Sequence, residues 1–140
     1  MAVVYRAYPS SLDKTNNLSF NQTRINQGSY GVYLDNSYST YLNGLYVKNC
    51  VFENQYYGNL FSYYSKNVGI RGNLFERNTS GVYYGYGIQL YYTTDSLSIM
   101  ENRIIQYNAG YAIYLYDADG TSTKRNKIAN NFISCKSVYS

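Results

Sequence analysis

The chain has 140 residues, of which 12 are Lys or Arg and 8 are Asp or Glu, giving a formal net charge of +4 at pH 7. This length predicts one domain with a hydrophobic core. The scattered basic residues argue against a nucleic-acid partner, whose binding site would cluster them. The absence of histidine excludes histidine-dependent catalysis, and no apolar run reaches the roughly 18 residues that would indicate a membrane span.

In chain order, residues 1–16 predict a partial N-terminal coil or lead-in, and residues 17–140 predict a repeat domain. The repeated motif has two apolar residues two positions apart, a small polar residue three positions later, and one more apolar residue two positions after that. The motif begins at Leu18, Leu45, Val68, Leu97 and Asn126, the last of which is polar. Its small polar residues are Thr23, Cys50, Asn73, Asn102 and Asn131.

A second apolar pair follows each of the first four motifs. Its members are Val32 and Leu34, then Asn59 and Phe61 (a degenerate pair), then Ile88 and Leu90, and finally Ile113 and Leu115. This alternation predicts short strands rather than helices. Strands this short bury an apolar face only by stacking on the next copy, about 4.8 Å away. The sequence therefore predicts a solenoid with a continuous apolar interior.

The repeat resembles a known family. The segments that carry the resemblance are Gly31–Leu34, Val68–Phe75, Gly87–Leu90, Leu97–Ile104 and Ile128–Ile133. They are similar to the right-handed parallel β-helix repeat of the pectate-lyase-like superfamily. This resemblance implies an all-β, right-handed parallel β-helix of about five coils over residues 17–140, with ends that lack an evident cap. The superfamily mixes lyases, hydrolases, surface proteins and non-catalytic sugar-binding scaffolds, so the fold alone does not decide the function.

The small polar residues of the motif are expected to form an inward ladder at one turn. There each asparagine can satisfy backbone groups of the neighbouring coils. Thr23 and Cys50 hold the same position in the first two coils, where we expect Cys50 to be a buried, inert thiol. Cys135 lies three coils away, about 14 Å at strand spacing, which is too far for a disulfide with Cys50. We expect Cys135 to be a free thiol or to form an intermolecular bridge.

Glu53 and Glu76 occupy the same register position on adjacent coils, and they are the candidate catalytic pair. A separation of about 5 Å matches the carboxylates of a retaining glycosidase in distance. The alternative, which we favour, is a surface patch of carboxylates neutralised by Lys48, Arg71 and Arg77.

Candidate calcium ligands fall in the loops after the second apolar pair. Asp117 and Asp119, with Asp95 on the coil below, could supply oxygen ligands for calcium. Asp95 also shares a register position with Lys66 one coil earlier, so the two could simply form an ion pair. The sequence shows no motif for any other metal or cofactor, and we expect none.

Tyrosine is the most informative excess, with 21 residues. We expect a carbohydrate-binding or partner-binding face at Tyr63, Tyr91, Tyr92, Tyr114 and Tyr116. The register places Tyr91 beside Tyr116 and Tyr63 beside Tyr92. One interpretation is a ladder that stabilises the sheet by roughly 0.2–1 kcal/mol per pair. The other is an exposed aromatic surface suited to sugar rings or to another protein.

The sequence thus favours a non-catalytic scaffold at the cell surface or outside the cell, acting through self-association or through display of the tyrosine face. Its partners would be further copies of the chain, or coils of a longer solenoid, stacked on its ends. Two alternatives remain open, a carbohydrate-binding module for a polysaccharide and a fragment of a polysaccharide lyase or glycoside hydrolase. The length weighs against the enzyme, because catalytic proteins with this fold are much longer.

Overall fold

The computed structural model describes residues 4–7, 16–78, 85–107 and 110–136, and the regular structure in these ranges is entirely β-strand. In chain order the strands are β1 (Val4–Ala7), β2 (Asn16–Asn21), β3 (Arg24–Asn26), β4 (Tyr30–Asp35), β5 (Leu42–Lys48), β6 (Val51–Glu53), β7 (Gly58–Arg71), β8 (Leu74–Arg77), β9 (Gly85–Met100), β10 (Arg103–Gln106), β11 (Gly110–Ala118), β12 (Lys127–Ala129) and β13 (Phe132–Cys135). The described part of the chain contains no apolar helix long enough to cross a bilayer.

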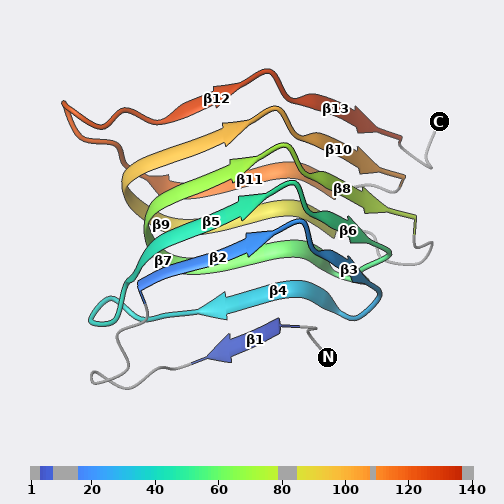
Figure 1. Ribbon diagram of the computed structural model, residues 1–140, viewed down its shortest axis with the longest axis horizontal. Coiled ribbons are helices and arrows are strands. Elements are labelled where there is room, and N and C mark those ends of the chain that lie inside the picture. Colours follow the sequence, from blue (N-terminus) through green and yellow to red (C-terminus); the bar gives the residue numbers. More distant parts are fainter. Residues whose placement is uncertain (1–3, 8–15, 79–84, 108–109, 137–140) are drawn as a thin grey trace.

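The strands stack in parallel as a β-solenoid, which confirms the expected fold class (Figure 1). One stack contains β2, β5, the second half of β7, the second half of β9, and β12. A second stack contains β3, β6, β8, β10 and β13. The third contains β1, β4, the first halves of β7 and β9, and β11. The strands β7 and β9 bend through a corner and so belong to two stacks each.

The described strands complete about four turns, one fewer than the sequence suggested. The difference arises at the last coil, where β12 and β13 are not followed by a described strand of the third stack. The hand of the solenoid stays a prediction from the family resemblance.

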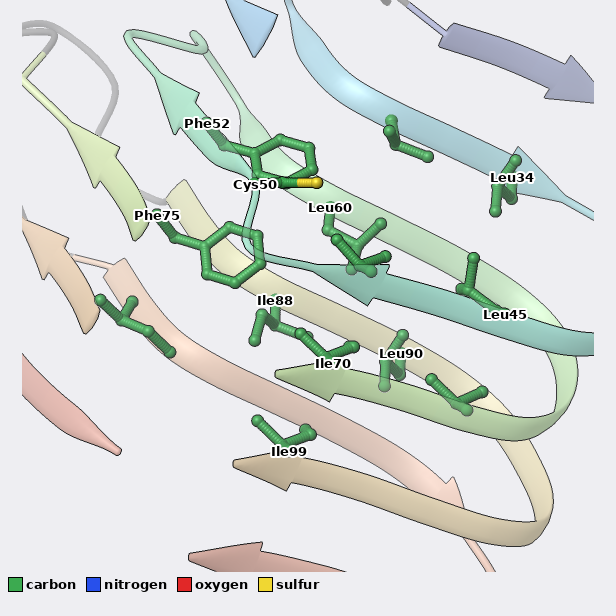
Figure 2. Close-up of a cluster of buried hydrophobic side chains, with 14 of the residues drawn as sticks. Leu34, Leu45, Cys50, Phe52, Leu60, Ile70, Phe75, Ile88, Leu90 and Ile99 are labelled. Carbon is green, nitrogen blue, oxygen red and sulfur yellow. The ribbon is translucent and has the colours of Figure 1, made fainter. Parts of the chain in front are cut away.

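The core is the column of inward apolar residues that the repeat predicts (Figure 2). Val47, Ile70 and Ile99 are register partners on successive coils and are fully buried. At the next corner, the rings of Phe52 and Phe75 stack with centroids 4.9 Å apart. Each coil therefore buries its apolar face against its neighbours, because no single coil can do so alone.

The second coil corrects one prediction. Leu60, and not Asn59, pairs with Val32 on one side and Ile88 on the other, so the apolar pair is shifted by one residue. The shift turns Phe61 outward, where its ring stacks on Tyr33 with a centroid separation of 4.5 Å. Phe61 is therefore buried, at 8% exposed, among outward aromatic rings rather than in the interior column.

Candidate functional site

The inward asparagines form a hydrogen-bonded column at the corner between the first and second stacks. Asn73 Nδ2 donates to Asn102 Oδ1 at 2.9 Å, and Asn102 Nδ2 donates to Asn131 Oδ1 at 3.0 Å. The same Oδ1 atoms accept the backbone N–H groups of Asn73 and Asn102, both at 3.0 Å. Each side chain also donates to a backbone carbonyl of the preceding coil, such as that of Ile70. The column satisfies backbone groups that the tight corner would otherwise bury unpaired.

The first two coils continue this column only in part. Cys50 is buried, its backbone N–H donates to Asn73 Oδ1 at 2.8 Å, and its thiol contacts the carbonyl of Lys48. Thr23 is exposed, and its hydroxyl donates to the carbonyl of Asn21 instead of to a neighbouring coil. Cys50 and Cys135 are both free thiols, the first buried and the second exposed.

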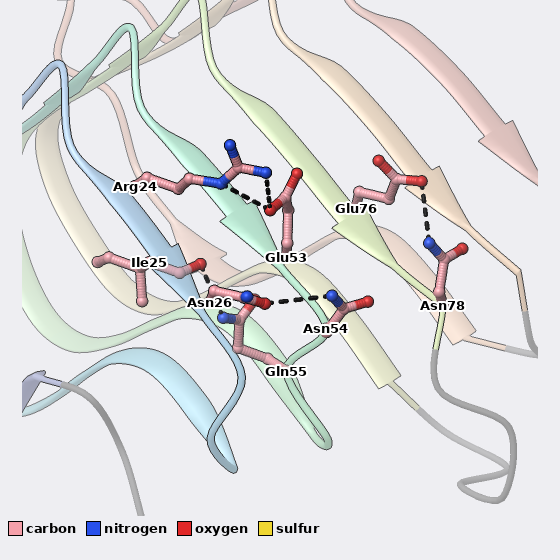
Figure 3. Close-up of polar contacts among 8 residues, drawn as sticks. All are labelled: Arg24, Ile25, Asn26, Glu53, Asn54, Gln55, Glu76 and Asn78. Carbon is pink, nitrogen blue, oxygen red and sulfur yellow. Dashed lines mark hydrogen bonds and ion pairs between the residues drawn. The ribbon is translucent and has the colours of Figure 1, made fainter.

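Glu53 and Glu76 are register partners on β6 and β8, and other side chains engage both carboxylates (Figure 3). Arg24 holds Glu53 through Nη2 and Nε, at 2.7 and 2.9 Å. Asn78 Nδ2 donates to Glu76 Oε1 at 3.1 Å. The cation beside Glu53 is therefore Arg24, which the sequence interpretation did not consider.

Two of the three expected neutralising cations have other partners. Arg71 forms a bidentate pair with Glu101, with both N–O distances at 2.8 Å. Arg77 is buried inside the solenoid, and its Nε donates to the carbonyls of Gln55 and Tyr56. The prediction that these arginines neutralise the Glu53 and Glu76 patch was wrong, because one lies against another carboxylate and the other points inward.

The structure does not bring the candidate calcium ligands together into a metal-binding cluster. In the described part of the chain, no three His, Cys, Asp or Glu side chains lie close enough to share a metal ion. Asp95 and Asp117 sit at corners with left-handed backbone (φ of 71° and 53°), and Asp119 is exposed at the end of β11. An irregularity in the pairing of β7 with β9 makes Thr94, not Asp95, the register partner of Lys66. The Lys66 ammonium lies 4.7 Å from the centre of the Tyr41 ring.

The tyrosines form one continuous network of ring contacts, which we call the tyrosine surface. It runs along the outside of the third stack and around the corner into the first stack. Its members are Tyr30, Tyr33, Tyr38, Tyr41, Tyr56, Tyr57, Phe61, Tyr63, Tyr64, Tyr86, Tyr91, Tyr92, Tyr111, Tyr114 and Tyr116. All five tyrosines predicted from the sequence belong to it.

One predicted pairing within the surface holds and another does not. Tyr91 is the register partner of Tyr116, as the sequence indicated. The partner of Tyr63 is Tyr91 and not Tyr92, with ring centroids 4.8 Å apart. Tyr92 stacks instead on Tyr64, with centroids 4.7 Å apart and planes 9° from parallel. The error is the same one-residue shift that displaced the apolar pair of the second coil.

Tyr64 and Tyr92 are unusual because both have a left-handed backbone, with φ of 51° and 52°. The other non-glycine residues with positive φ are Asn, Gln, Asp or Glu. Asn and Asp are enriched in this conformation, whereas bulky residues are rare there. The corner therefore carries two stacked aromatic rings where the backbone would favour asparagine or glycine.

The rings of the tyrosine surface pack on each other both face to face, as Tyr64 does on Tyr92, and edge to face, as Tyr92 does on Tyr116. Tyr116 is 50% exposed and Tyr38 is 79% exposed, whereas Tyr63, Tyr64 and Tyr92 are only partly exposed. Packing removes water from the hydroxyls and raises the pKa of Tyr63 above that of a free tyrosine, with further contributions from the neighbouring phenols. The surface is therefore a closely packed set of rings rich in hydroxyl groups.

The sequence also placed Tyr33 at an outward strand position and Tyr64 just past the second apolar pair, and both belong to the surface. Tyr41 and Tyr86 were not singled out from the sequence. Tyr86 lies two residues before the inward Ile88, so simple alternation would have turned it inward.

Over residues 3–138, the sequence matches the family described as NosD, periplasmic copper-binding protein. The match covers nearly the whole chain, so the chain belongs to the NosD family. The family match and the stacked parallel strands together confirm the expected resemblance to parallel β-helix repeat proteins. No curated protein and no solved structure matches the chain.

Proposed function

We propose that this member of the NosD family is a non-catalytic scaffold that works outside the cytoplasm and docks a polysaccharide chain on its tyrosine surface. The observation that carries the proposal is the stack of Tyr64 on Tyr92 at a left-handed corner. Backbone strain that persists in a structure is typical of functional sites. The periplasmic description of the family supports a location outside the cytoplasm.

The groups beside this stack suit a hydroxyl-rich polymer. Asn67 Nδ2 donates to Asn43 Oδ1 at 2.8 Å, and Ser96 Oγ donates to Asn67 Oδ1 at 3.1 Å. The Lys124 ammonium reaches the same oxygen at 3.4 Å. A polysaccharide has apolar C–H faces, which pack on aromatic rings, and hydroxyls, which bond to phenol, amide and ammonium groups. The charged side chains beside these rings are of both signs, namely Asp35, Asp117 and Lys66, so no net charge of one sign selects a charged polymer, which favours a neutral glycan.

The carboxylates support a scaffold rather than a glycosidase. A retaining mechanism needs one carboxylate free to attack the sugar and one protonated to act as an acid. Here Arg24 engages the Glu53 carboxylate through two hydrogen bonds and Asn78 bonds to the Glu76 carboxylate. Both carboxylates are therefore already engaged by side chains of the protein itself.

The residues of this chain do not fit the copper in the family's description. Copper in proteins is bound by imidazole, thiolate and thioether groups, and the 140 residues include no histidine, two cysteines and two methionines. Cys50 is buried in the core and Cys135 is exposed on β13, with β8 and β10 between their strands. We therefore assign no copper chemistry to these residues.

A second candidate is self-association through the last coil. Ile128, Phe132 and Ile133 on β12 and β13 are 52%, 53% and 48% exposed. Apolar side chains of a solenoid coil are normally covered by a further coil, and a second copy could provide one. Light scattering over a hundredfold concentration range tests this. Growth that is lost in Ile128→Asp supports association, and a constant monomer mass overturns it.

The docking proposal is tested with Tyr64→Asn and Tyr92→Asn. Asparagine accepts the left-handed backbone, so each variant removes a ring while the corner keeps its conformation. The probes are soluble dextran, a mixed-linkage β-glucan and polygalacturonate. The readout is tyrosine emission, which dominates the protein's fluorescence because the chain has no tryptophan. The matched control is Tyr107→Asn, which removes a ring that is 40% exposed and lies outside the tyrosine surface.

We expect a saturable change with at least one neutral glucan, at least tenfold weaker in both corner variants and unchanged in the control. Circular dichroism shows whether the variants fold. A response equal in all variants, or no response to any probe, overturns docking at this surface. Release of reducing ends that disappears in Glu76→Gln would contradict the non-catalytic assignment.

A further inference from the structure

A buried polar cluster lies inside the solenoid, where the second stack turns into the third. It consists of Gln55, Asn59, Arg77 and Gln106, each at most 1% exposed. Asn59 Nδ2 donates to Gln55 Oε1 at 2.5 Å, and Gln55 Nε2 donates to the carbonyls of Ile25 and Gln27. The cluster touches the tyrosine surface at the Tyr56 carbonyl, which accepts from Arg77 Nε, but its side chains lie inside the solenoid and the proposed function does not use them.

The guanidinium of Arg77 is only partly satisfied in this cluster. Its Nε donates to two backbone carbonyls, at 3.1 and 3.2 Å, but Nη1 and Nη2 are buried without a hydrogen-bond partner. The ion pairs of the described residues are Arg24 with Glu53 and Arg71 with Glu101, so no described carboxylate compensates Arg77. A buried cation without a counter-charge carries a large desolvation penalty.

The fold provides the space for this guanidinium. A Cβ at Gly85 would lie 1.7 Å from Nη1 of Arg77, so position 85 excludes any side chain while the guanidinium is there. Gln106 is the register partner of Arg77 on the next coil, and its amide lies beneath Gly87, with 3.2 Å between Nε2 and a Cβ built there. Both atoms of that amide are buried and unpartnered. Gly85 and Gly87 are two residues apart on β9, about 7 Å.

We propose that Arg77 and Gln106 form an internal binding site for a small monovalent anion, chloride being the probe. The site presents buried N–H donors from the guanidinium and from the Gln106 amide, and the anion supplies the charge that the fold leaves out. An oxyanion of phosphate or sulfate size is disfavoured because Arg77 and Gln106 are at most 1% exposed, so the site has little room beyond the two side chains. The anion is structural, because the site lies inside the solenoid and not on a surface.

The test is thermal unfolding of the full chain in chloride, with gluconate keeping the ionic strength constant. A ligand that binds only the folded state stabilises it by about 1.4 kcal/mol for each tenfold increase above Kd, which for this length raises Tm by about 5 °C. We expect this rise in the wild type and its loss in Arg77→Met. Gln106→Glu provides a second test, because it places a permanent carboxylate next to the guanidinium. This variant should have a higher Tm at low chloride and no chloride dependence.

The matched control is Arg24→Met, which removes an exposed arginine and should keep the wild-type chloride response. An equal chloride response in the wild type and Gln106→Glu overturns the proposal. So does a wild-type Tm that does not change with chloride, since water or backbone carbonyls would then satisfy the guanidinium. Because Gln106→Glu keeps Arg77, it still decides the question if Arg77→Met fails to fold. Neither result depends on polysaccharide binding, so this proposal and the proposed function fail separately.

Discussion

Replacing Asn102 by alanine tests how much the asparagine column contributes to the stability of the solenoid. Asn102 is 2% exposed and sits in the middle of the column. Its loss leaves the backbone N–H of Asn73 and the carbonyl of Ile70 buried without those partners. It also breaks two side-chain bonds, to Asn73 and to Asn131. Each buried backbone group left unpaired costs about 1–3 kcal/mol, so we expect a loss of about 3–5 kcal/mol, before any cavity effect.

The assay is urea unfolding followed by circular dichroism and by tyrosine emission, which should give coincident transitions if unfolding is two-state. The matched control is Asn131→Ala, which removes the same chemical group one coil further along, where the side chain is only partly buried. We expect the control to lose about 1–2 kcal/mol, because water can reach the groups it leaves unpaired. A loss below about 1 kcal/mol in Asn102→Ala, or equal losses in both variants, would refute the argument that burial makes the column important.

Three further predictions concern the glycines, the tyrosines and a surface ion pair. Gly110→Ala should destabilise by about 3 kcal/mol in urea unfolding, because its Cβ would lie 2.3 Å from a backbone oxygen. Gly69→Ala, whose Cβ meets only the Tyr46 ring at 3.2 Å, should cost far less; equal losses would contradict this. The raised pKa of Tyr63 means that its contribution to stability is complete below the pKa of an unfolded tyrosine and is lost as the pH rises through the folded value. The part of the tyrosinate absorbance that is lost in Tyr63→Phe should therefore develop at a higher pH in the folded protein than in the urea-unfolded chain, and development at the same pH in both would contradict the burial. Arg24→Ala should lower the free energy of unfolding by less than about 1 kcal/mol, because the Arg24 side chain is 70% exposed. A larger loss that persists at high salt would contradict this.

The fold could be predicted from the sequence because stacking repeats one physical requirement in every coil. Inward positions must be apolar and the corner position small and polar, so the motif recurs even where the loops differ in length. The prediction failed where two residues satisfied the pattern equally well. At Asn59 and Leu60 both side chains are buried, and the single-residue choice decided which face Phe61 and the tyrosines after it occupy.

The polar partners were harder to predict than the core. Register predicted that Glu53 and Glu76 are neighbours, and the structure has them as register partners. Register does not determine which long side chain reaches a carboxylate, because arginine spans more than one strand spacing. The two observed ion pairs join neighbouring coils, Arg24 with Glu53 and Arg71 with Glu101. The sequence permits other pairings between coils, and the side-chain conformations select these two.

In this solenoid, different positions of the repeat form the core and the tyrosine surface. Inward residues such as Ile70 and Ile99 stack whatever lies outside, so the outward positions are free to carry any side chain that tolerates a strand. Tyr64 and Tyr92 do not lie at such permissive positions, because their left-handed backbone disfavours a bulky side chain. Ring stacking at 4.7 Å offsets part of the strain, but an asparagine at either position would avoid the strain altogether. Stability alone therefore does not account for aromatic rings at this corner, and this is the observation on which the docking proposal rests.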